Sequence, residues 1–402
     1  MYQLRKGSKY LVFFVVIFVA LPPFATDTYI PAFGSISSFF QVDVSILSIT
    51  ISTYLIGFGV GMVFWGALSD RFGRKNILII GMLIYILSTI LCSFTHDFDM
   101  LIFMRFMQGL GDSPASIAAS AILKDCYRGQ KLIKMMATMA TMAMIFMIAP
   151  IVAPIIGSII IYTTGRWQDI FHFLTIYGII LLIISFAIPE TLMSKNRSKS
   201  LPYSFKVYFK HLINPPFIIT SVASGLCFGA FFSFISSSSN LIIGYYKLGY
   251  IRFCILFALN ICGVVLASYY IKNKINSSNE KYFIFMGYAS VIVILIANII
   301  SSTYLNNIYL FIILNAFATV SFSLINIITT TKAIDLLKEG FAAGNAIVRL
   351  LRFIAAGFAG FLISFSSVSN LMIEIPVQQL GFVILSILIF MVIKNRLFPV
   401  KA

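Results

Sequence analysis

The chain has 402 residues, of which 60% are hydrophobic and only 10% are charged. A soluble domain of this length cannot sustain so apolar a composition, so the sequence predicts an all-α membrane protein. The formal net charge of +16 would fit a nucleic-acid-binding protein, but most of the cations lie in short loops between apolar segments, and that placement excludes the nucleic-acid class.

Twelve apolar segments follow one another, each about long enough to cross a bilayer as a helix, which takes roughly 20 residues. They lie near residues 10–32, 44–65, 76–94, 100–122, 136–161, 170–188, 216–241, 251–271, 282–302, 308–330, 341–365 and 376–393. Of the 29 Lys and Arg residues, 23 fall on the side that holds the N-terminus. The positive-inside rule therefore predicts that both termini are cytoplasmic.

A polar, basic and proline-rich stretch divides the twelve segments into six and six. We expect an N-terminal six-helix half at residues 1–190, a cytoplasmic loop at 191–215 and a C-terminal six-helix half at 216–402. Two such halves around a central loop form the architecture of many secondary transporters, whose substrate sites lie near the membrane midplane between the halves.

The first two spans carry candidate cavity residues. Asp27 interrupts an apolar helix, and a carboxylate is costly in hydrocarbon, so we expect it to face a protein-lined cavity where it can bind and release a proton. The alternative is a position at the outer membrane surface, since about 16 residues at 1.5 Å each separate it from Leu11. Tyr54 in the second span either lines the same cavity or packs between helices.

The fourth span carries Arg105 and, seven residues later on the same face, Asp112. An arginine keeps its charge at any workable pH, so Arg105 cannot carry the proton, but it can pair with a carboxylate or an anionic substrate. The two residues indicate a cavity wall. The alternative is an internal ion pair that holds helices together, at a desolvation cost.

The fifth span repeats small residues and prolines at a spacing of four, with Pro150, Pro154 and Gly157 on adjoining stripes. Proline removes a backbone hydrogen bond and bends a helix, and small residues let a neighbouring helix come close. The pattern predicts a hinge or a close-packing face.

Several motifs carry a family resemblance. The turn GALSDRFGRK at residues 66–75 resembles the loop signature of the major facilitator superfamily between its second and third helices. The motifs TDTYIPAF, MRFMQGLG, APIVAPIIG, GRWQDIF and PETL, which begin at residues 26, 104, 149, 165 and 189, resemble the drug:proton antiporter branch, and within it the Bcr/CflA type that exports bicyclomycin and chloramphenicol. In the C-terminal half only AAGNAIVRLLRF at 342–353 is similar to the family's eleventh helix.

The resemblance implies twelve transmembrane helices in two pseudo-symmetric halves, and proton-coupled export of small hydrophobic compounds or drugs by alternating access. Asp27 matches the family's first-helix proton and cation site, and Arg105 its fourth-helix arginine. A proton that enters from outside would neutralise Asp27 and weaken its hold on a substrate or on Arg105, which would bias the equilibrium between two states. Asp112 matches no family position.

The resemblance also implies a conformational latch in the turn at 66–75. Asp70 would meet the positive N-terminal end of the eleventh helix, and Arg74 would pair with Asp125. The other signature positions of the latch are Gly66, Arg71 and Gly73. The implied partners are protons, a small-molecule substrate and the lipid bilayer of a bacterial inner membrane, with the proton gradient as energy source, no cofactor and a monomer as the working unit.

A second interpretation keeps the fold and changes the cargo to an anionic metabolite or siderophore, bound by Arg105, Arg349 and Arg352. Arg349 and Arg352 lie about 12–17 Å along a helix that starts at 341, too deep to be loop cations. They either bind an anionic group or a partner acid, or extend to the inner surface. No enzyme and no metal site are expected, because the histidines stand in separate segments and the five cysteines lack ligand spacing.

Overall fold

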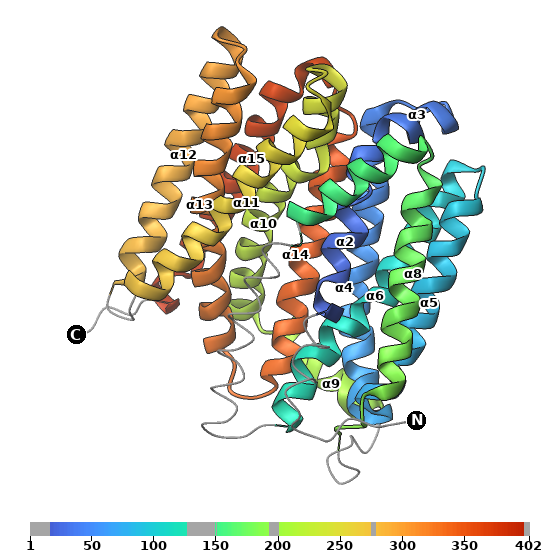
Figure 1. Ribbon diagram of the computed structural model, residues 1–402. Helices are drawn as coiled ribbons and strands as arrows, with labels where there is room; N and C mark the ends of the chain where they lie inside the picture. The colour runs from blue at the N-terminus through green and yellow to red at the C-terminus, as the bar shows by residue number, and fades with distance from the viewer. Residues whose placement is uncertain (1–16, 127–148, 150, 193–200, 275–278, 398–402) are drawn as a thin grey trace. The chain divides into compact units, whose positions relative to one another are not determined.

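The computed structural model describes residues 17–126, 149, 151–192, 201–274 and 279–397 (Figure 1). It is built from helices, and within the described residues nine of them are long and apolar enough to cross a membrane. A further helix, α6 (Phe98–Cys126), covers the fourth predicted span and is more polar, because Arg105, Gln108 and Asp112 lie within it. The first and fifth predicted spans are described only in part.

The chain forms two compact units. The first comprises Met1–Ile36 and Thr53–Phe209, and the second comprises Ser37–Ser52 and Lys210–Ala402. The elements up to the central region are α2 (Leu21–Asp27), η1 (Ile30–Ala32), α3 (Phe33–Phe40), η2 (Val44–Leu47), α4 (Ser48–Phe72), α5 (Arg74–Phe94), α6, the helix Ile151–Thr164, α8 (Gln168–Ala187) and α9 (Leu201–Leu212). The remaining elements are α10 (Pro215–Ser239), η4 (Asn240–Tyr245), α11 (Gly249–Lys274), α12 (Glu280–Tyr304), α13 (Ile308–Asp335), α14 (Phe341–Ile363), η5 (Val368–Asn370) and α15 (Leu371–Leu397).

In the first unit, α5 packs against α6 and α8 (Figure 1). Glycines allow α6 to approach its neighbours closely. A methyl group on Gly109 would overlap the backbone carbonyl of Tyr54 in α4, and one on Gly111 would lie 2.5 Å from the backbone nitrogen of Tyr85 in α5. Backbones this close need residues without side chains. The glycines of α6 therefore set the distance at which Tyr54 faces this helix.

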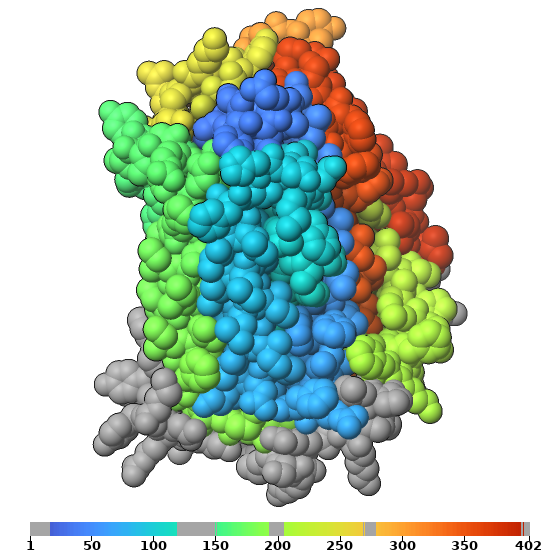
Figure 2. All heavy atoms as spheres, turned by 90° about the vertical axis from the view of Figure 1, so that its right-hand side faces the viewer, coloured from blue at the N-terminus to red at the C-terminus, as the bar shows by residue number. Residues whose placement is uncertain are grey.

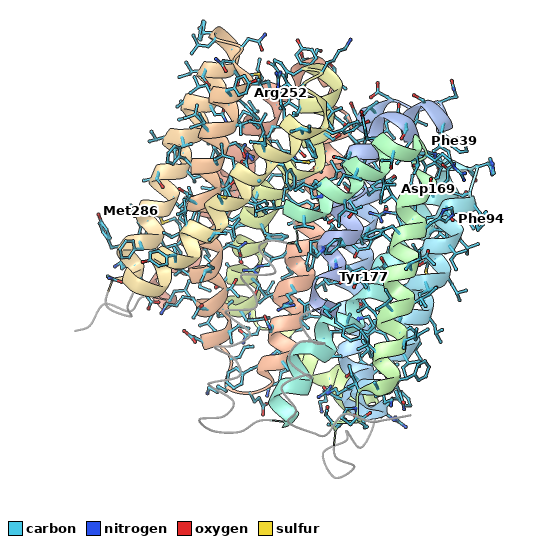
Figure 3. All side chains as sticks on the ribbon, in the orientation of Figure 1. Phe39, Phe94, Asp169, Tyr177, Arg252 and Met286 are labelled. Carbon is cyan, nitrogen blue, oxygen red and sulfur yellow. The ribbon has the colours of Figure 1, made fainter. Side chains whose placement is uncertain are left out.

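The short helix α2 is held by α8. The hydroxyl of Tyr177 (Figure 3) donates a hydrogen bond of 2.7 Å to the backbone carbonyl of Ile17, and the Tyr177 ring meets Phe24 edge-on at 5.4 Å. Pro22 and Pro23 stand in the first turn of α2, where a proline costs no hydrogen bond. These contacts fix the end of α2, where Asp27 lies.

The predicted turn at 66–75 is shorter than expected. Helix α4 continues to Phe72 and α5 starts at Arg74, so Gly73 alone separates them, with a φ of 97° that suits glycine. The central loop also differs from the expected irregular chain, because residues 201–212 form α9. Proline at the second position of α9 and a leucine, phenylalanine and tyrosine stripe favour that helix.

In the second unit, α10 packs against α13, α14 and α15, while α11 and α12 pack on α13. Ser386 of α15 ties three helices together. Its hydroxyl donates to the backbone carbonyl of Ala223 in α10 at 2.8 Å, and it shares a hydrogen bond of 2.8 Å with the hydroxyl of Tyr288 in α12. Such shared hydrogen bonds satisfy polar groups that lipid cannot.

Candidate functional site

One face of α6 carries three fully buried polar residues, Arg105, Gln108 and Asp112. Their spacing of three and four residues places them on one stripe of the helix. The side chains of Arg105 and Asp112 thus lie inside the first unit, away from lipid. The shared stripe of Arg105 and Asp112 was expected from their spacing, and the cavity wall inferred from it stays a prediction.

Arg105 is stabilised mainly by aromatic rings. Its guanidinium carbon lies 4.7 Å from the ring centroids of both Tyr29 and Tyr54, and 6.0 Å from that of Phe171. A cation over a desolvated ring gains about 2 kcal/mol. Its Nη1 also donates to the backbone carbonyl of Ala25 at 3.2 Å. The positive charge therefore sits between aromatic faces of α4, α8 and the segment after α2.

A chain of hydrogen bonds continues from Arg105 to α5. Nη1 of Arg105 donates to Oε1 of Gln108 at 2.5 Å, and Nε2 of Gln108 donates to the hydroxyl of Thr89 at 2.8 Å. The Thr89 hydroxyl then donates to the backbone carbonyl of Tyr85 at 2.6 Å. The sequence did not single out Gln108 or Thr89, because nothing in their spacing distinguishes them from other polar residues within spans.

Tyr54 connects the buried cation to the buried acid. Its ring stacks on Arg105 while its hydroxyl donates to Oδ2 of Asp112. Arg105 and Asp112 form no direct ion pair among the described residues. Within that part of the chain, Nε and Nη2 of Arg105 and Oδ1 of Asp112 make no hydrogen bond. The network thus keeps donors and one acceptor that other groups can use.

Asp27 lies at the end of α2 and is only 5% exposed, so its carboxyl group is covered by protein and does not lie at a water-facing surface. The hydroxyl of Thr26 donates to Oδ1 of Asp27 at 2.8 Å. In the described part of the chain, Asp27 forms no ion pair with Arg105. The backbone carbonyl of Ala25, two residues before Asp27, accepts a hydrogen bond from Arg105.

The predicted hinge residues lie beside α2. A methyl group on Gly157 would overlap the backbone carbonyl of Thr28. The backbone of the helix Ile151–Thr164 therefore contacts the backbone at the end of α2 directly. Pro154 is buried in the same helix, one turn earlier. Pro150 lies outside the described residues, and its role in bending the helix stays a prediction.

The signature at 66–75 forms a compact polar cluster. Nη1 of Arg74 lies 2.7 Å from Oδ1 of Asp70 and donates to the hydroxyl of Ser69 at 2.8 Å. The side chain of Asp125 lies outside the described residues, and the tie of Asp70 to the eleventh helix would join the two units. Both predicted latch pairs therefore stay predictions.

Glu190 contacts the signature at 66–75, and the sequence assigned it no role. Its carboxylate accepts hydrogen bonds from the backbone nitrogens of Arg74 at 3.1 Å and Lys75 at 3.3 Å, which are the first two residues of α5. A negative charge at a helix N-terminus satisfies unpaired N–H groups and complements the helix dipole. A methyl group on Gly73 would overlap this carboxylate. In the sequence, Glu190 is marked by its place in the motif PETL, which begins at residue 189.

Tyr208 of α9 rests on the same cluster. A methyl group on Gly66 would overlap the Tyr208 hydroxyl, and Tyr208 is buried. Burial raises the pKa of Tyr208 above its ordinary value, the nearby Asp70 carboxylate raises it further, and Arg74 opposes the shift. Helix α9 therefore packs on this cluster through Tyr208, whose hydroxyl lies against Gly66 and close enough to Asp70 and Arg74 to feel their charges.

In the second unit, Arg352 of α14 is held by neutral groups. Its Nη2 donates to the side-chain and backbone oxygens of Asn326 and to the hydroxyl of Thr330, and its Nε donates to the hydroxyl of Ser224 at 3.2 Å. Its guanidinium carbon lies 5.9 Å above the Phe228 ring. No carboxylate pairs with Arg352 in the described part of this unit.

Arg349 stands one turn before Arg352 on the same helix and is partly buried. Within the described residues it makes no ion pair. The acids Glu280 and Glu339 are instead paired with Lys332 and Lys210. The structure thus brings Arg349 and Arg352 together without an acidic partner from their own unit, which leaves two cations close together on α14.

The chain is similar in sequence to bacterial transport proteins. The family described as Major Facilitator Superfamily matches residues 12–360. A bicyclomycin resistance protein homolog of Haemophilus influenzae is 28% identical over 270 residues, which are 66% of this chain and 66% of that protein. The multidrug resistance protein MdtL of Salmonella typhimurium is 28% identical over 230 residues, 56% of each. The chain therefore spans between about half and two thirds of these curated relatives.

Two solved structures share the fold. A D-xylose-proton symporter superposes with a TM-score of 0.72 at 15% identity, over 95% of this chain and 98% of that one. The xylose transporter XylE from E. coli, in a partially occluded inward-open conformation, gives a TM-score of 0.69 at 15% identity, over 96% and 98%. Together with the family match, these similarities confirm the predicted all-α membrane architecture.

Proposed function

The chain belongs to the major facilitator superfamily, and from its buried polar network we propose that it is a proton-coupled secondary transporter that exports small hydrophobic compounds by alternating access. The observation that supports this best is the link from Arg105 through Tyr54 to Asp112, since it joins a permanent cation to a carboxyl group that can bind a proton. Relatives named for bicyclomycin and multidrug resistance support drugs as the cargo.

The chemistry follows from one proton. With Asp112 ionised, its charge offsets that of Arg105, and Tyr54 holds the two groups in one arrangement. When Asp112 is protonated, the network keeps a net positive charge, and in a low-dielectric interior this change alters the energy of any neighbouring charge or dipole. If the energy difference between the two conformations depends on whether Asp112 is protonated, protonation changes their populations. This dependence is the requirement for coupling. Asp27, also buried, is the second acid that can carry the proton.

Transport in vesicles tests the proposal. Purified protein is reconstituted, a pH gradient is imposed, and the uptake of labelled bicyclomycin is measured together with its counterflow exchange without a gradient. Asp27→Asn and Asp112→Asn are compared with Asp97→Asn, an exposed acid outside the network. We expect at least one of the two buried variants to lose gradient-driven uptake and keep exchange. Gradient-driven uptake at the parent rate in both would overturn the proposal.

We further propose a bacterial inner-membrane location, with both termini in the cytoplasm, and two six-helix halves at 1–190 and 216–402 joined by the segment 191–215. The concentration of cations on one side of the predicted spans supports this orientation. The working unit is a monomer, and the proton gradient supplies the energy without a cofactor. The latch of Gly66, Asp70, Arg71, Gly73 and Arg74 would set the balance between the two conformations.

A second candidate function, the transport of an anionic metabolite or siderophore, is favoured by one observation. Arg352 is bonded to neutral groups, and Arg349 beside it has no ion pair within the described residues. A buried cation without a counter-charge is costly, and an anionic cargo would offset that cost. Uptake of an anionic and of a neutral cargo is compared in the variant with Arg349→Ala and Arg352→Ala. Loss confined to the anionic cargo would favour this second function.

A further inference from the structure

A groove of about 420 Å³ lies on the first unit where α4 ends and α5 begins. Its walls are almost entirely apolar, and they consist of Trp65, Leu68, Phe72, Asn76, Ile77, Ile79 and Ile80. Helices α4 and α5 lie on the face that Figure 2 shows. The side chains of Phe72 and Ile80 are 42% and 44% exposed, so the groove opens to the surroundings of the protein.

The groove is preformed by contacts that hold its inner wall. The indole nitrogen of Trp65 donates a hydrogen bond of 3.0 Å to the backbone carbonyl of Leu110 in α6, and Trp65 is 6% exposed. The polar end of the indole is thus turned inward and its ring forms the wall. Trp65 stands eight residues before Gly73, about 12 Å along the helix, so the groove extends from the turn along α4.

One cation stands at the mouth of the groove. The guanidinium carbon of Arg71 lies 5.5 Å above the ring of Phe72, which is a groove residue. Within the described part of the chain, Arg71 makes no hydrogen bond and no ion pair. The other charged groups of the turn have partners: Asp70 pairs with Arg74, and the ammonium of Lys75 donates to the backbone carbonyl of Phe186.

We propose that this groove binds an anionic phospholipid, with an acyl chain along the apolar walls and the headgroup phosphate on Arg71. The argument rests on charge complementarity beside an apolar groove at the loop side that carries most of the cations. A guanidinium binds a phosphate with two parallel hydrogen bonds. The phosphate of an anionic lipid is preferred because its headgroup carries no ammonium that would offset the phosphate charge and repel Arg71. The lipid would contact both helices that flank Gly73.

Trp65 allows a direct test, because the chain has only two tryptophans. With Trp167→Phe in place, the remaining fluorescence comes from Trp65 in the groove wall. The protein is reconstituted with lipids brominated in the acyl chain, which quench fluorescence on contact, and phosphatidylglycerol is compared with phosphatidylcholine. We expect brominated phosphatidylglycerol to reach half-maximal quenching at about fivefold lower mole fraction, the effect of one cation at an anionic surface.

Three variants distinguish lipid binding at this groove from the general attraction of anionic lipid to a basic protein. Arg71→Gln should bring the two lipids to equal quenching, whereas Lys206→Gln, which removes an exposed cation from α9, should leave the preference unchanged. Ile80→Gln, which puts an amide into the apolar wall, should weaken quenching by both lipids. Equal quenching by the two lipids in the parent, or an equal loss in Arg71→Gln and Lys206→Gln, would overturn the proposal.

If Trp167→Phe reduces folding, native mass spectrometry of the unsubstituted protein measures the same preference. Retention of phosphatidylglycerol after detergent exchange is then compared between the parent, Arg71→Gln and Lys206→Gln. The expected result is a loss of retained lipid in Arg71→Gln alone. Equal retention in the parent and Arg71→Gln would overturn the proposal, whatever the transport rate of either protein.

Discussion

Tyr54 shows how much a single residue can do in a buried network. Its ring covers the Arg105 guanidinium, its hydroxyl donates to Asp112, and its backbone carbonyl lies against Gly109 of the same helix α6. Ring and hydroxyl contribute separately, because one stabilises a cation and the other an anion. A substitution that removes only the hydroxyl therefore separates the two contributions.

We predict that Tyr54→Phe lowers gradient-driven uptake about tenfold, since a hydrogen bond to a charged group contributes about 1.5 kcal/mol or more and a tenfold change in rate corresponds to about 1.4 kcal/mol. The ring still covers Arg105, so thermal stability should change little. The control is Tyr304→Phe, which removes a phenol at an 82% exposed position outside the network. An equal fall in both variants would contradict the role of the Asp112 contact.

Tyr208 gives a prediction on pH. Burial, with the Asp70 carboxylate, raises the pKa of Tyr208 in the folded protein above its ordinary value near 10. The folded state therefore binds this proton more tightly than the unfolded state, so the stabilisation is complete below about pH 10 and is lost as pH rises through the folded-state pKa. The melting temperature should fall less steeply above pH 10 in Tyr208→Phe than in the parent. Tyr304→Phe, at an 82% exposed position, is the control, and equal slopes in parent and Tyr208→Phe would contradict the prediction.

At the scale of elements, the junction of α4, α5 and α9 depends on glycines and one acid. Gly73 separates two long helices, Glu190 accepts from the first N–H groups of α5, and Tyr208 of α9 fits against Gly66. The sequence predicted both spans and the charged turn between them, because these follow from apolar length and charge. It did not predict the contacts of Glu190 and Tyr208, since they join segments more than 100 residues apart and depend on packing.

The fit of α9 against α4 can be tested by a pair of substitutions. Gly66→Ala should loosen α9, because the added methyl group would overlap the Tyr208 hydroxyl, and we expect a loss of about 1–3 kcal/mol, as for other overpacked sites. Tyr208→Phe removes that hydroxyl, so the double variant should recover part of the loss. Thermal unfolding and the rate of protease cleavage near α9 report the result. Additive losses in the double variant would show that the two residues do not meet.

At the scale of the whole molecule, the sequence predicted the features that depend on composition and residue spacing, and it missed those that depend on helix packing. Membrane residence and helix count come from composition and segment length, and Arg105 and Asp112 share a face of α6 because they are seven residues apart. Asp27 was expected to hold either a substrate or Arg105. Within the described residues Asp27 and Arg105 form no ion pair, and aromatic rings surround the cation. Hydropathy cannot show that aromatic rings, and not a carboxylate, lie beside Arg105. In the sequence Tyr29 and Tyr54 look like any other residue of a membrane span, and only helix packing brings them to the cation.

The orientation of the whole chain in the membrane gives the last prediction. Tyr304 ends α12 and is 82% exposed, and Lys338 lies in the exposed turn between α13 and α14. The cation distribution puts Tyr304 outside and Lys338 in the cytoplasm, since only the Lys338 side gathers positive charge. In a variant without its native cysteines, a membrane-impermeant maleimide should label Tyr304→Cys in intact cells at least tenfold faster than Lys338→Cys, a difference that the roughly 30 Å hydrocarbon barrier supports. Permeabilised cells should label both alike, which serves as the control. Rapid labelling of Lys338→Cys in intact cells would reverse the assigned orientation, and with it the side of the membrane on which the latch and the lipid groove lie.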